Sequence, residues 1–485
     1  MRAAFEEIAD PRTAPPGEAD ERGRASRPSP WLPPRAVVSG DRVVVSDGRR
    51  LHVLSLSTQK LLTRAPIPLR ADDPSAPNAL RGAEARHVWG LIEGFGLTVA
   101  GDDVYANVPA RDVGQGDPPG AEPSGDDRAT PDDPPRGPTD DAVCAVRLEG
   151  DGGRVRWTAG GLAGTPGLPE RLRLVGTPLL YRGAVHVAGL RPSHTGKETE
   201  AWHVALDPAT GAVRSTVFLG TGSPLRRGRT DEAMPSGCVG AHGRVHLVTA
   251  LGIAAAVDAR TGRTLWAYRY DRGRPDGADV TRRLTLGAER SPRRTSFANQ
   301  PPVVVDGRLY LAPTDGRHVL CLSDRPRGPG RVLTRWALHR TEDVRNLAIE
   351  HVVGVTEEAG DVPPTLVAVG QGYGLDPLQD PFTCVVAVDV RDARVRWERA
   401  LPFGGIPEPF GLAALAGDDV FVPTAKGIAR YALLDGADRP SIEAPAEDGE
   451  GAYGLEEAYG NLVPVAGRGL VAVAPSRVTF YLAPK

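Results

Sequence analysis

Apolar and polar residues alternate along most of this chain in short runs that are interrupted by glycine. The segments AVVSGDRVVVS, VVVDGRLYLA and AALAGDDVFVP show the pattern. Alternation with a period of two is typical of a β-strand with one buried face, and a glycine between two such runs permits the positive φ of a tight hairpin turn. The pattern predicts seven hairpins and a looser eighth, which turn at Gly40, Gly101, Gly183, Gly243, Gly307, Gly417 and Gly467 and around Gly360.

A second pattern follows most of these hairpins. In AVDARTGRTLW, Asp258 and Gly262 precede Trp266. An acidic side chain can cap a turn and glycine again suits a positive φ, so we expect a further hairpin with the tryptophan in mid-strand. A large flat side chain at a fixed place in each sheet fills the gap to a neighbouring sheet. The frame recurs, in whole or in part, at Ser55, Thr58 and Gln59, at Glu149, Gly153 and Trp157, at Asp207, Thr210 and Gly211, and at Asp389 and Trp397.

Together the two patterns form an internal repeat. A repeat of roughly 40 to 60 residues built from four short strands is the signature of a β-propeller blade. We therefore predict an all-β chain that folds as an eight-bladed β-propeller of four-stranded antiparallel sheets over residues 31–485. Residues 1–30 are expected to be a disordered leader or linker. The last repeat has only three strands, and we expect an N-terminal strand around Trp31 to complete it and close the ring.

The longest segments between predicted strands fall at one end of the blades. Insertions in repeat proteins cluster on the binding side, so this long-loop face is the predicted site for a protein or peptide partner. Drift in loop length without function is the alternative, and the acidic, Pro/Gly-rich loop 107–141 is predicted to be disordered. The segments are 107–141, 190–200 and 371–381 within blades, and 65–93, 221–236, 271–297, 402–410 and 435–459 between blades.

Residues that precede the innermost strands are predicted to surround the central channel. Their carboxylates, amides and aromatic rings are suited to a flat or polar ligand, and capping of the loops is the alternative role. The candidates are Trp89, Glu93, Asn299, Gln300, Glu350, His351, Glu408, Phe410, Tyr459 and Asn461.

One position in the second strand of several blades holds a ring. His186 and His246 share it with Tyr105, Tyr310 and Phe421. Two equivalent histidines suggest a metal site, but packing against the next sheet explains all five residues, and we therefore predict no metal. The cysteines lack CxxC spacing and lie in apolar runs, so we expect small buried hydrophobic residues, with a chance disulfide between strands as the alternative. They are Cys144, Cys238, Cys321 and Cys384.

Charge and hydropathy narrow the classes of partner. The formal net charge is −3, from 58 basic and 61 acidic residues, and the arginines are scattered, so we expect no nucleic-acid partner. No apolar run is long enough for a signal peptide or a membrane span. The chain is therefore expected in the cytoplasm as it is written, or in the periplasm or cell envelope if an export signal precedes Met1, and the sequence leaves the localisation open.

The frame A-x-D-x-x-T-G-x-x-x-W, after a V-x-D-G-x-L-Y hairpin, resembles the PQQ-like repeat of bacterial eight-bladed propellers. The resemblance extends over roughly 31–485 and is strongest at 237–340 and 381–400. One branch of that superfamily, the quinoprotein alcohol and glucose dehydrogenases, implies pyrroloquinoline quinone (PQQ) and calcium at the funnel. An alcohol-dehydrogenase-type site also implies adjacent cysteines, a stacking Trp, Glu and Asn metal ligands and a catalytic Asp. This chain has no adjacent cysteines, and no motif assigns those roles to its residues.

The other branch resembles the lipoprotein subunit of the outer-membrane β-barrel assembly machine and implies an interaction scaffold without a cofactor. This chain lacks a lipobox cysteine near its start, and GxSxG, HExxH and Walker motifs are absent from its sequence. We therefore predict a monomeric, non-enzymatic scaffold, without cofactor, that binds a protein or peptide on the long-loop face. The alternatives are a PQQ-dependent dehydrogenase with a funnel active site and a sensor domain detached from a longer chain.

Overall fold

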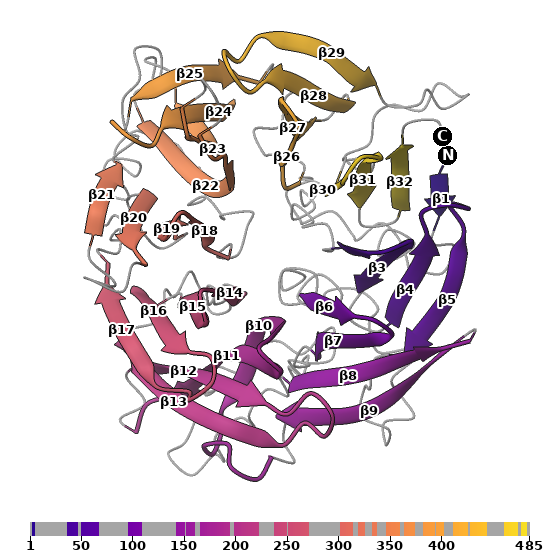
Figure 1. Cartoon of the computed structure of the whole chain (residues 1–485), viewed down its shortest axis with the longest axis vertical. Helices are drawn as coiled ribbons and strands as arrows, with labels where there is room; N and C mark the ends of the chain where they lie inside the picture. Colours follow the sequence, from indigo (N-terminus) through magenta and orange to yellow (C-terminus); the bar gives the residue numbers. More distant parts are fainter. Residues whose placement is uncertain are drawn as a thin grey trace, which may run out of the picture.

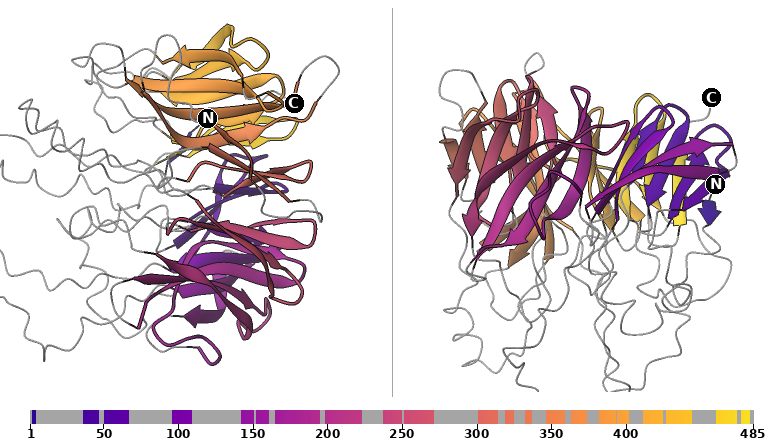
Figure 2. Two further views of the ribbon diagram at one scale, coloured as in Figure 1. Left: turned by 90° about the vertical axis from the view of Figure 1, so that its left-hand side faces the viewer. Right: turned by 90° about the horizontal axis from the view of Figure 1, so that it is seen from below.

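The fold was analysed in a computed structural model of the chain. The structure describes residues 2–4, 36–66, 96–108, 142–222, 237–270, 301–336, 346–401, 411–443 and 460–482, apart from gaps at 47–49, 151, 161–164, 195–197, 250, 314–318, 325–331, 359–362, 374–381, 393, 425–426 and 474–476. The described strands form eight four-stranded antiparallel sheets arranged around a central axis (Figures 1 and 2). The predicted fold class, an eight-bladed all-β propeller, is confirmed.

Each of the first four blades runs from the axis outwards in the order of its strands. Blade 1 contains β2 (Ala36–Ser39), β3 (Arg42–Ser46), β4 (Arg50–Ser55) and β5 (Leu61–Pro66). Blade 2 contains β6 (Leu97–Ala100), β7 (Asp103–Val108), β8 (Ala142–Glu149) and β9 (Gly152–Gly160). Blade 3 contains β10 (Arg173–Tyr181), β11 (Ala184–Pro192), β12 (Thr199–Leu206) and β13 (Val213–Gly222). Blade 4 contains β14 (Val239–Ala241), β15 (Arg244–Val248), β16 (Ile253–Asp258) and β17 (Thr264–Arg269).

The next three blades repeat this order, and the eighth takes one strand from the N-terminus. Blade 5 contains β18 (Val303–Val305), β19 (Arg308–Leu311), β20 (Val319–Ser323) and β21 (Val332–Trp336). Blade 6 contains β22 (Asn346–Val355), β23 (Thr365–Tyr373), β24 (Phe382–Asp389) and β25 (Val395–Ala400). Blade 7 contains β26 (Ala414–Ala416), β27 (Asp419–Thr424), β28 (Gly427–Ala432) and β29 (Asp438–Glu443). Blade 8 contains β30 (Asn461–Val465), β31 (Gly469–Val473), β32 (Arg477–Leu482) and β1 (Arg2–Ala4).

The ring is closed by β1, which pairs antiparallel with β32. Arg2 lies opposite Thr479 and Ala4 opposite Arg477, so the two ends of the chain share one blade (Figure 1). An N-terminal closing strand was predicted, but its predicted position around Trp31 is wrong, and Trp31 itself lies outside the described residues. The edge of β32 needs only backbone donors and acceptors, so no large side chain marks the strand that covers it.

The hydrophobic core is divided among the junctions between blades. Each of its eight clusters combines residues from two neighbouring blades. Val44 packs towards blade 2, whereas Val43 and Val45 pack towards blade 8. Because successive side chains of a strand point to opposite faces, each sheet contributes to two cores, and every blade depends on both neighbours.

The first hairpin of each blade turns where the sequence predicted. His242 and Gly243 have φ of 51° and 77°, as a type I′ turn requires, and the other described turn glycines also have positive φ. Gly360 lies outside the described residues, although β22 and β23 form the expected looser hairpin around it.

The second hairpin explains the spacing between the acidic residue and the tryptophan. The Oδ1 atom of Asp258 accepts hydrogen bonds from the backbone N–H of Arg260 at 3.1 Å and of Thr261 at 2.7 Å, and Asp207 caps its own turn in the same way. The tryptophan contacts the next blade. Trp157 of blade 2 packs on Gly211 of blade 3, and its Nε1 donates to the Pro208 carbonyl at 3.0 Å, an arrangement that we call the tryptophan lock.

The same lock joins blades 6 and 7, where Trp397 packs on Gly436 and donates to the Leu433 carbonyl at 2.9 Å. Trp266 is also buried in a junction, between blades 4 and 5. In blade 5, the carbonyl that corresponds to those of Pro208 and Leu433 belongs to Asp324. It accepts a hydrogen bond from Arg244, at 2.5 Å, and not from the tryptophan. Within the described residues, Trp266 Nε1 has no partner.

Blade 2 departs from the predicted frame. Ala145 lies opposite Trp157 in the same way that Ala256 lies opposite Trp266 in blade 4. Two residues further along each strand, Arg147 therefore corresponds to Asp258. Glu149, which the frame predicted for this position, does not. Glu149 pairs with Gly152 at the end of an extended hairpin. A tight turn at Gly150, with a φ of 53°, allows both strands to continue where blades 3, 4 and 6 have an acidic cap.

Two glycines with nearly the same φ provide a test of the tryptophan lock. A Cβ at Gly211 (φ 73°) would lie 2.7 Å from the Trp157 ring, whereas one at Gly183 (φ 74°) would meet no atom within 4 Å. We expect Gly183→Ala to cost about 1 to 2 kcal/mol for its backbone conformation, and Gly211→Ala to cost about 1 to 3 kcal/mol more because of overpacking. Urea unfolding of both variants measures the difference in the free energy of unfolding. Equal losses of stability would show that the Trp157 ring does not pack against the turn at Gly211.

Candidate binding face and central channel

The two ends of the disc differ in their connections. Within each blade, the first-to-second and third-to-fourth strand turns lie on one side, which we call the tight-turn face. The antiparallel order places the remaining connections at the opposite end, the long-loop face (Figure 2). The predicted segments of this face lie largely outside the described residues.

Six of the predicted long segments overlap strands, and the overlap is largest in 190–200 and 435–459. Arg191 pairs with Glu200 and Pro192 with Thr199, so β11 and β12 occupy much of 190–200. Residues 438–443 form β29, so the third-to-fourth turn and the outer strand of blade 7 occupy the start of 435–459. The polar residues of both segments lie on strands with an exposed face, which the alternation rule does not distinguish from a polar loop.

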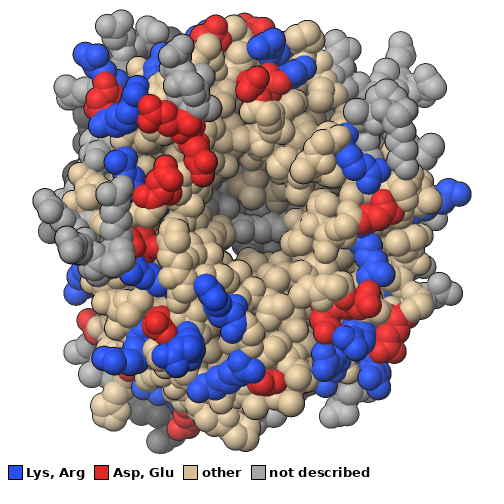
Figure 3. All heavy atoms as spheres, in the orientation of Figure 1, with Lys and Arg blue, Asp and Glu red and all other residues tan. Residues whose placement is uncertain are grey.

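The central channel opens as a hollow on the tight-turn face (Figure 3). Five of the inner strands that end at this face, β2, β6, β14, β18 and β26, are built only from Val, Ala, Leu, Gly, Ser and Thr. These five strands carry no charged residue, so they offer no ion pair to a charged ligand.

Two of the ten predicted channel residues have described side chains, and both form bonds between blades 6, 7 and 8. His351 is buried and its Nε2 accepts from the Ala413 N–H at 3.4 Å. Asn461 is also buried and its Oδ1 accepts from the Leu412 N–H at 2.8 Å. Glu350 is described only as part of β22, and the others lie outside the described residues: Trp89, Glu93, Asn299, Gln300, Glu408, Phe410 and Tyr459.

Three of the ring-bearing positions pack towards the next blade as predicted. Tyr105 donates to the Pro208 carbonyl of blade 3 at 3.4 Å, and Tyr310 and Phe421 lie in the cores shared with the following blades. His186 stacks on His203 of its own blade, with ring centroids 5.2 Å apart. In the described part of the chain, no three His, Cys, Asp or Glu residues form a group that could hold a metal ion.

All four cysteines are buried and free, so the predicted role as small hydrophobic residues is confirmed. Burial raises the pKa of the Cys144 and Cys238 thiols to about 12 and that of Cys321 to about 11. Thiols with such high pKa values stay protonated near neutral pH and are poor nucleophiles.

A buried charge cluster joins blades 4 and 5. The side chain of Asp324 is fully buried and accepts from Arg244 at 2.8 Å and from His242 at 3.2 Å, with His246 Nε2 at 3.3 Å. Burial alone would raise the pKa of Asp324, but hydrogen bonds and charge from His246, Arg244 and His242 outweigh it and lower the pKa to about 2. The sequence frame missed Asp324 because it is one residue beyond the capping position.

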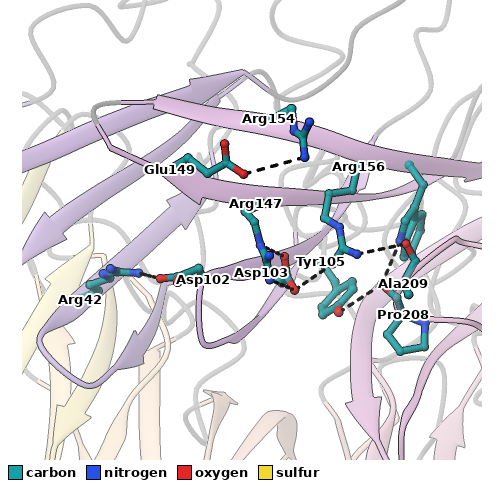
Figure 4. A network of polar contacts seen from close by, with 11 residues as sticks. Arg42, Asp102, Asp103, Tyr105, Arg147, Glu149, Arg154, Arg156, Pro208 and Ala209 are labelled. Carbon is teal, nitrogen blue, oxygen red and sulfur yellow. Dashed lines mark hydrogen bonds and ion pairs between the residues drawn. The ribbon is translucent and has the colours of Figure 1, made fainter.

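Exposed ion pairs cross other junctions on the tight-turn face. Arg42 of blade 1 reaches Asp102 of blade 2 at 2.7 Å (Figure 4). Within blade 2, Asp103 binds both Arg147 and Arg156, and Arg156 also donates to the Ala209 carbonyl of blade 3 at 3.3 Å. These two groups of contacts link the turns of blade 2 to those of blades 1 and 3.

Sequence reasoning also missed an aromatic cluster on blade 3. Trp202 and Phe218 meet edge to face with centroids 5.4 Å apart, and Arg191 lies over the Trp202 ring at 5.0 Å. The sequence feature that could have indicated this cluster is the segment 190–200, which was predicted to be a loop and is part of a long hairpin.

The chain was compared with known proteins. No protein-family model and no curated protein matches its sequence. BamB from Moraxella catarrhalis is similar in structure, with a TM-score of 0.50 and 14% identity over 92% of this chain and 94% of that one. A quinohemoprotein alcohol dehydrogenase from Comamonas testosteroni gives 0.51 and 14% over 93% and 71%, and a europium-containing methanol dehydrogenase gives 0.51 and 11% over 90% and 81%.

The chain shares the fold of these proteins. At these identities the likeness concerns the fold alone, and it agrees with the propeller architecture that the repeat predicted. Separately, none of the described elements is a helix long and apolar enough to cross a membrane.

The described residues do not fit PQQ and calcium. PQQ is a tricarboxylate that needs hydrogen-bond donors or cations, and calcium takes six to eight oxygen ligands. Five of the inner strands carry no charged residue, and His351 Nε2 and Asn461 Oδ1 already accept backbone hydrogen bonds.

Two ion pairs of nearly equal length test what burial adds. Asp324→Asn leaves Arg244 partly buried without its counter-ion, and we expect it to cost about 3 to 5 kcal/mol. Asp102 is 57% exposed in its pair with Arg42, so Asp102→Asn should cost less than about 1 kcal/mol. Chemical unfolding of both variants checks the contrast, and a small cost for Asp324→Asn would refute a structural role for the cluster.

The buried histidine pair predicts a loss of stability in acid. Desolvation lowers the pKa of His186 to about 4 and of His203 to about 3, whereas an unfolded histidine has a pKa near 6.5. Below that pH only the unfolded chain binds protons, so the free energy of unfolding falls by ~1.4 kcal/mol per pH unit for each histidine, down to the folded pKa.

The variant His186→Phe isolates this effect, because blade 7 carries Phe421 at the same position. From about pH 7.5 to about pH 5, we expect the wild-type protein to lose ~2 kcal/mol more stability than the variant in urea unfolding. An identical loss in both proteins would contradict the assignment.

Proposed function

We propose that this protein is a non-enzymatic scaffold that binds a protein or peptide partner on its long-loop face. The observation that carries the proposal is the asymmetry between the two ends of the blades. Six described first hairpins turn through two residues, as at His242 and Gly243, whereas β7 and β8 are joined by residues 109–141. Repeat proteins bear their insertions on the side that binds.

The disc provides a fixed platform for such a face. Clusters of buried side chains fill all eight junctions, and β1 ties the last blade to the first through its pairing with β32. A preorganised surface loses less conformational entropy when it binds, so a scaffold benefits from this rigidity.

The described polar groups near the channel and the junctions support binding over catalysis. His351 and Asn461 link neighbouring blades, His186 bonds to His203, and Asp324 neutralises Arg244. A general acid or base needs an accessible group with a pKa near the working pH, and these groups are buried and committed to other contacts.

Site-specific photo-crosslinking tests which face binds. A benzophenone amino acid at His194, exposed between β11 and β12, probes the long-loop face, and the same probe at Asp435, exposed between β28 and β29, is the matched control on the tight-turn face. In the native cell we expect a specific protein adduct from His194 only. Adducts from Asp435 alone, or from neither position, would contradict the proposal.

The dehydrogenase alternative has its own test. Purified protein is titrated with PQQ and calcium by isothermal calorimetry and then assayed for dye reduction with alcohols and aldoses. We expect neither saturable binding nor turnover, since the described residues contain no group of His, Cys, Asp or Glu that could hold the calcium ion. Saturable binding with turnover would replace the scaffold with an enzyme.

A further inference from the structure

The outer edge of blade 3 is an open strand edge in the described ring. Strand β13 pairs with β12 on one side and comes last in its sheet. Among the described residues, no backbone hydrogen bond joins β13 to any element other than β12. Its outward N–H and C=O groups therefore form a row that another extended chain can pair with.

Every other outer strand carries residues that discourage such pairing. Natural sheets protect their edges with charges, proline or short length. The outer strands of the other blades have arginine or proline in their sequences: Arg2 in β1, Arg64 and Pro66 in β5, Arg154 and Arg156 in β9, Arg269 in β17, Arg335 in β21, Arg396 and Arg399 in β25, and Arg439 and Pro440 in β29.

Strand β13 has a single charged residue, Arg214 near its start, and no proline. It is ten residues long, the longest of the outer strands, and the run STVFLGTG from Ser215 to Gly222 contains neither charge nor proline. Phe218 lies in the middle of this run and its surface is 48% exposed. A long uncharged edge with an exposed aromatic residue favours strand addition.

Phe218 is held in place by a row of side chains across the blade. It lies opposite Trp202 in the β12–β13 register, and the two rings meet edge to face. Trp202 Nε1 donates to Glu200 at 2.9 Å, and Arg191 both pairs with Glu200 at 2.5 Å and lies over the indole ring. The Trp202–Phe218 row therefore ends at the open edge with its last ring already oriented, which reduces the entropy lost on binding.

We propose that the β13 edge binds an extended peptide segment of a partner protein as a fifth strand of blade 3. The backbone groups of β13 supply the hydrogen bonds, and an aromatic or β-branched side chain of the peptide lies across from Phe218 and continues the row. This surface is on the circumference of the disc, so the inference goes beyond the proposed function and holds or fails independently of it.

Desolvation favours a single peptide over a second copy of the protein. Antiparallel pairing of two β13 strands would bring neighbouring blades of both discs together, with β9 opposite its own copy. Arg154 of β9 is 74% exposed and pairs with Glu149 at 4.0 Å, so such a dimer would have to desolvate two of these charged pairs. A lone strand does not bring a second pair to the interface.

Fluorescence anisotropy with a labelled model peptide tests the site. The probe is a lysine-flanked peptide of alternating threonine and valine with a central phenylalanine, and its twin carries N-methyl groups on the backbone amides along one edge. We expect the first to bind and the twin to bind at least about tenfold more weakly, because strand addition needs those N–H groups.

Two matched lysine variants locate the binding. Phe218→Lys places a charge on the proposed edge, and Leu265→Lys does so at a residue of β17 that is 42% exposed. Both variants should remain folded with a cooperative unfolding transition, while only Phe218→Lys should weaken peptide binding, by about tenfold or more. Absence of binding, equal binding of the methylated twin, or equal effects of the two variants would overturn the proposal.

Sedimentation separates the peptide site from a dimer interface. We expect both the wild-type protein and the Phe218→Lys variant to sediment as monomers. A dimer that Phe218→Lys dissociates would overturn the proposal in favour of a second copy. Crosslinking from His194 reports on the long-loop face alone, so failure there and failure at β13 are distinguishable.

Discussion

Apolar packing between neighbouring sheets is the interaction on which the rest of this molecule depends. A four-stranded sheet of short strands cannot bury both of its faces alone, and here each face is covered by the next blade. Alternation within one strand is enough to supply two junctions, as Val43, Val44 and Val45 show. In an open row of blades, the first and last sheets would each leave one apolar face uncovered. Closing the ring covers both faces, and the pairing of β1 with β32 completes the last blade.

Polar contacts set the register of the blades within this apolar frame. The indole N–H of Trp157 and of Trp397 each finds a carbonyl in the turn of the following blade, and a glycine there makes room for the ring. At the junction of blades 4 and 5, Arg244 binds the corresponding carbonyl of Asp324. At this junction a buried contact between Arg244 and Asp324 takes the place of the hydrogen bond from the indole. The Trp266 N–H is left without a described partner.

The architecture was largely readable from the sequence because the period-two pattern and the turn glycines are local signals. The fold class, the turn positions and the burial of Trp157, Trp266 and Trp397 followed from them. What failed depends on pairing between distant segments: the closing strand at Arg2–Ala4 has no side-chain signature, and the shift of Glu149 follows from an extended hairpin that only the register reveals.

The candidate site was less accessible to sequence reasoning. Asn461 and His351 could be placed near inner strands, but their hydrogen bonds to Leu412 and Ala413 depend on how neighbouring blades meet. The row from Arg191 to Phe218 crosses three strands, and its members are far apart in the chain. The open edge of β13 is noticeable only by comparison with the other outer strands.

The central claim is that a closed ring of mutually dependent blades gives the protein a rigid disc on which to present its binding surfaces. Amide hydrogen exchange in a chain that lacks residues 1–4 tests it most directly. Without β1, the account predicts faster exchange in β32 and in the strands of blade 1 that pack on blade 8, together with a lower unfolding midpoint. Unchanged exchange in both blades would contradict closure as the source of the rigidity.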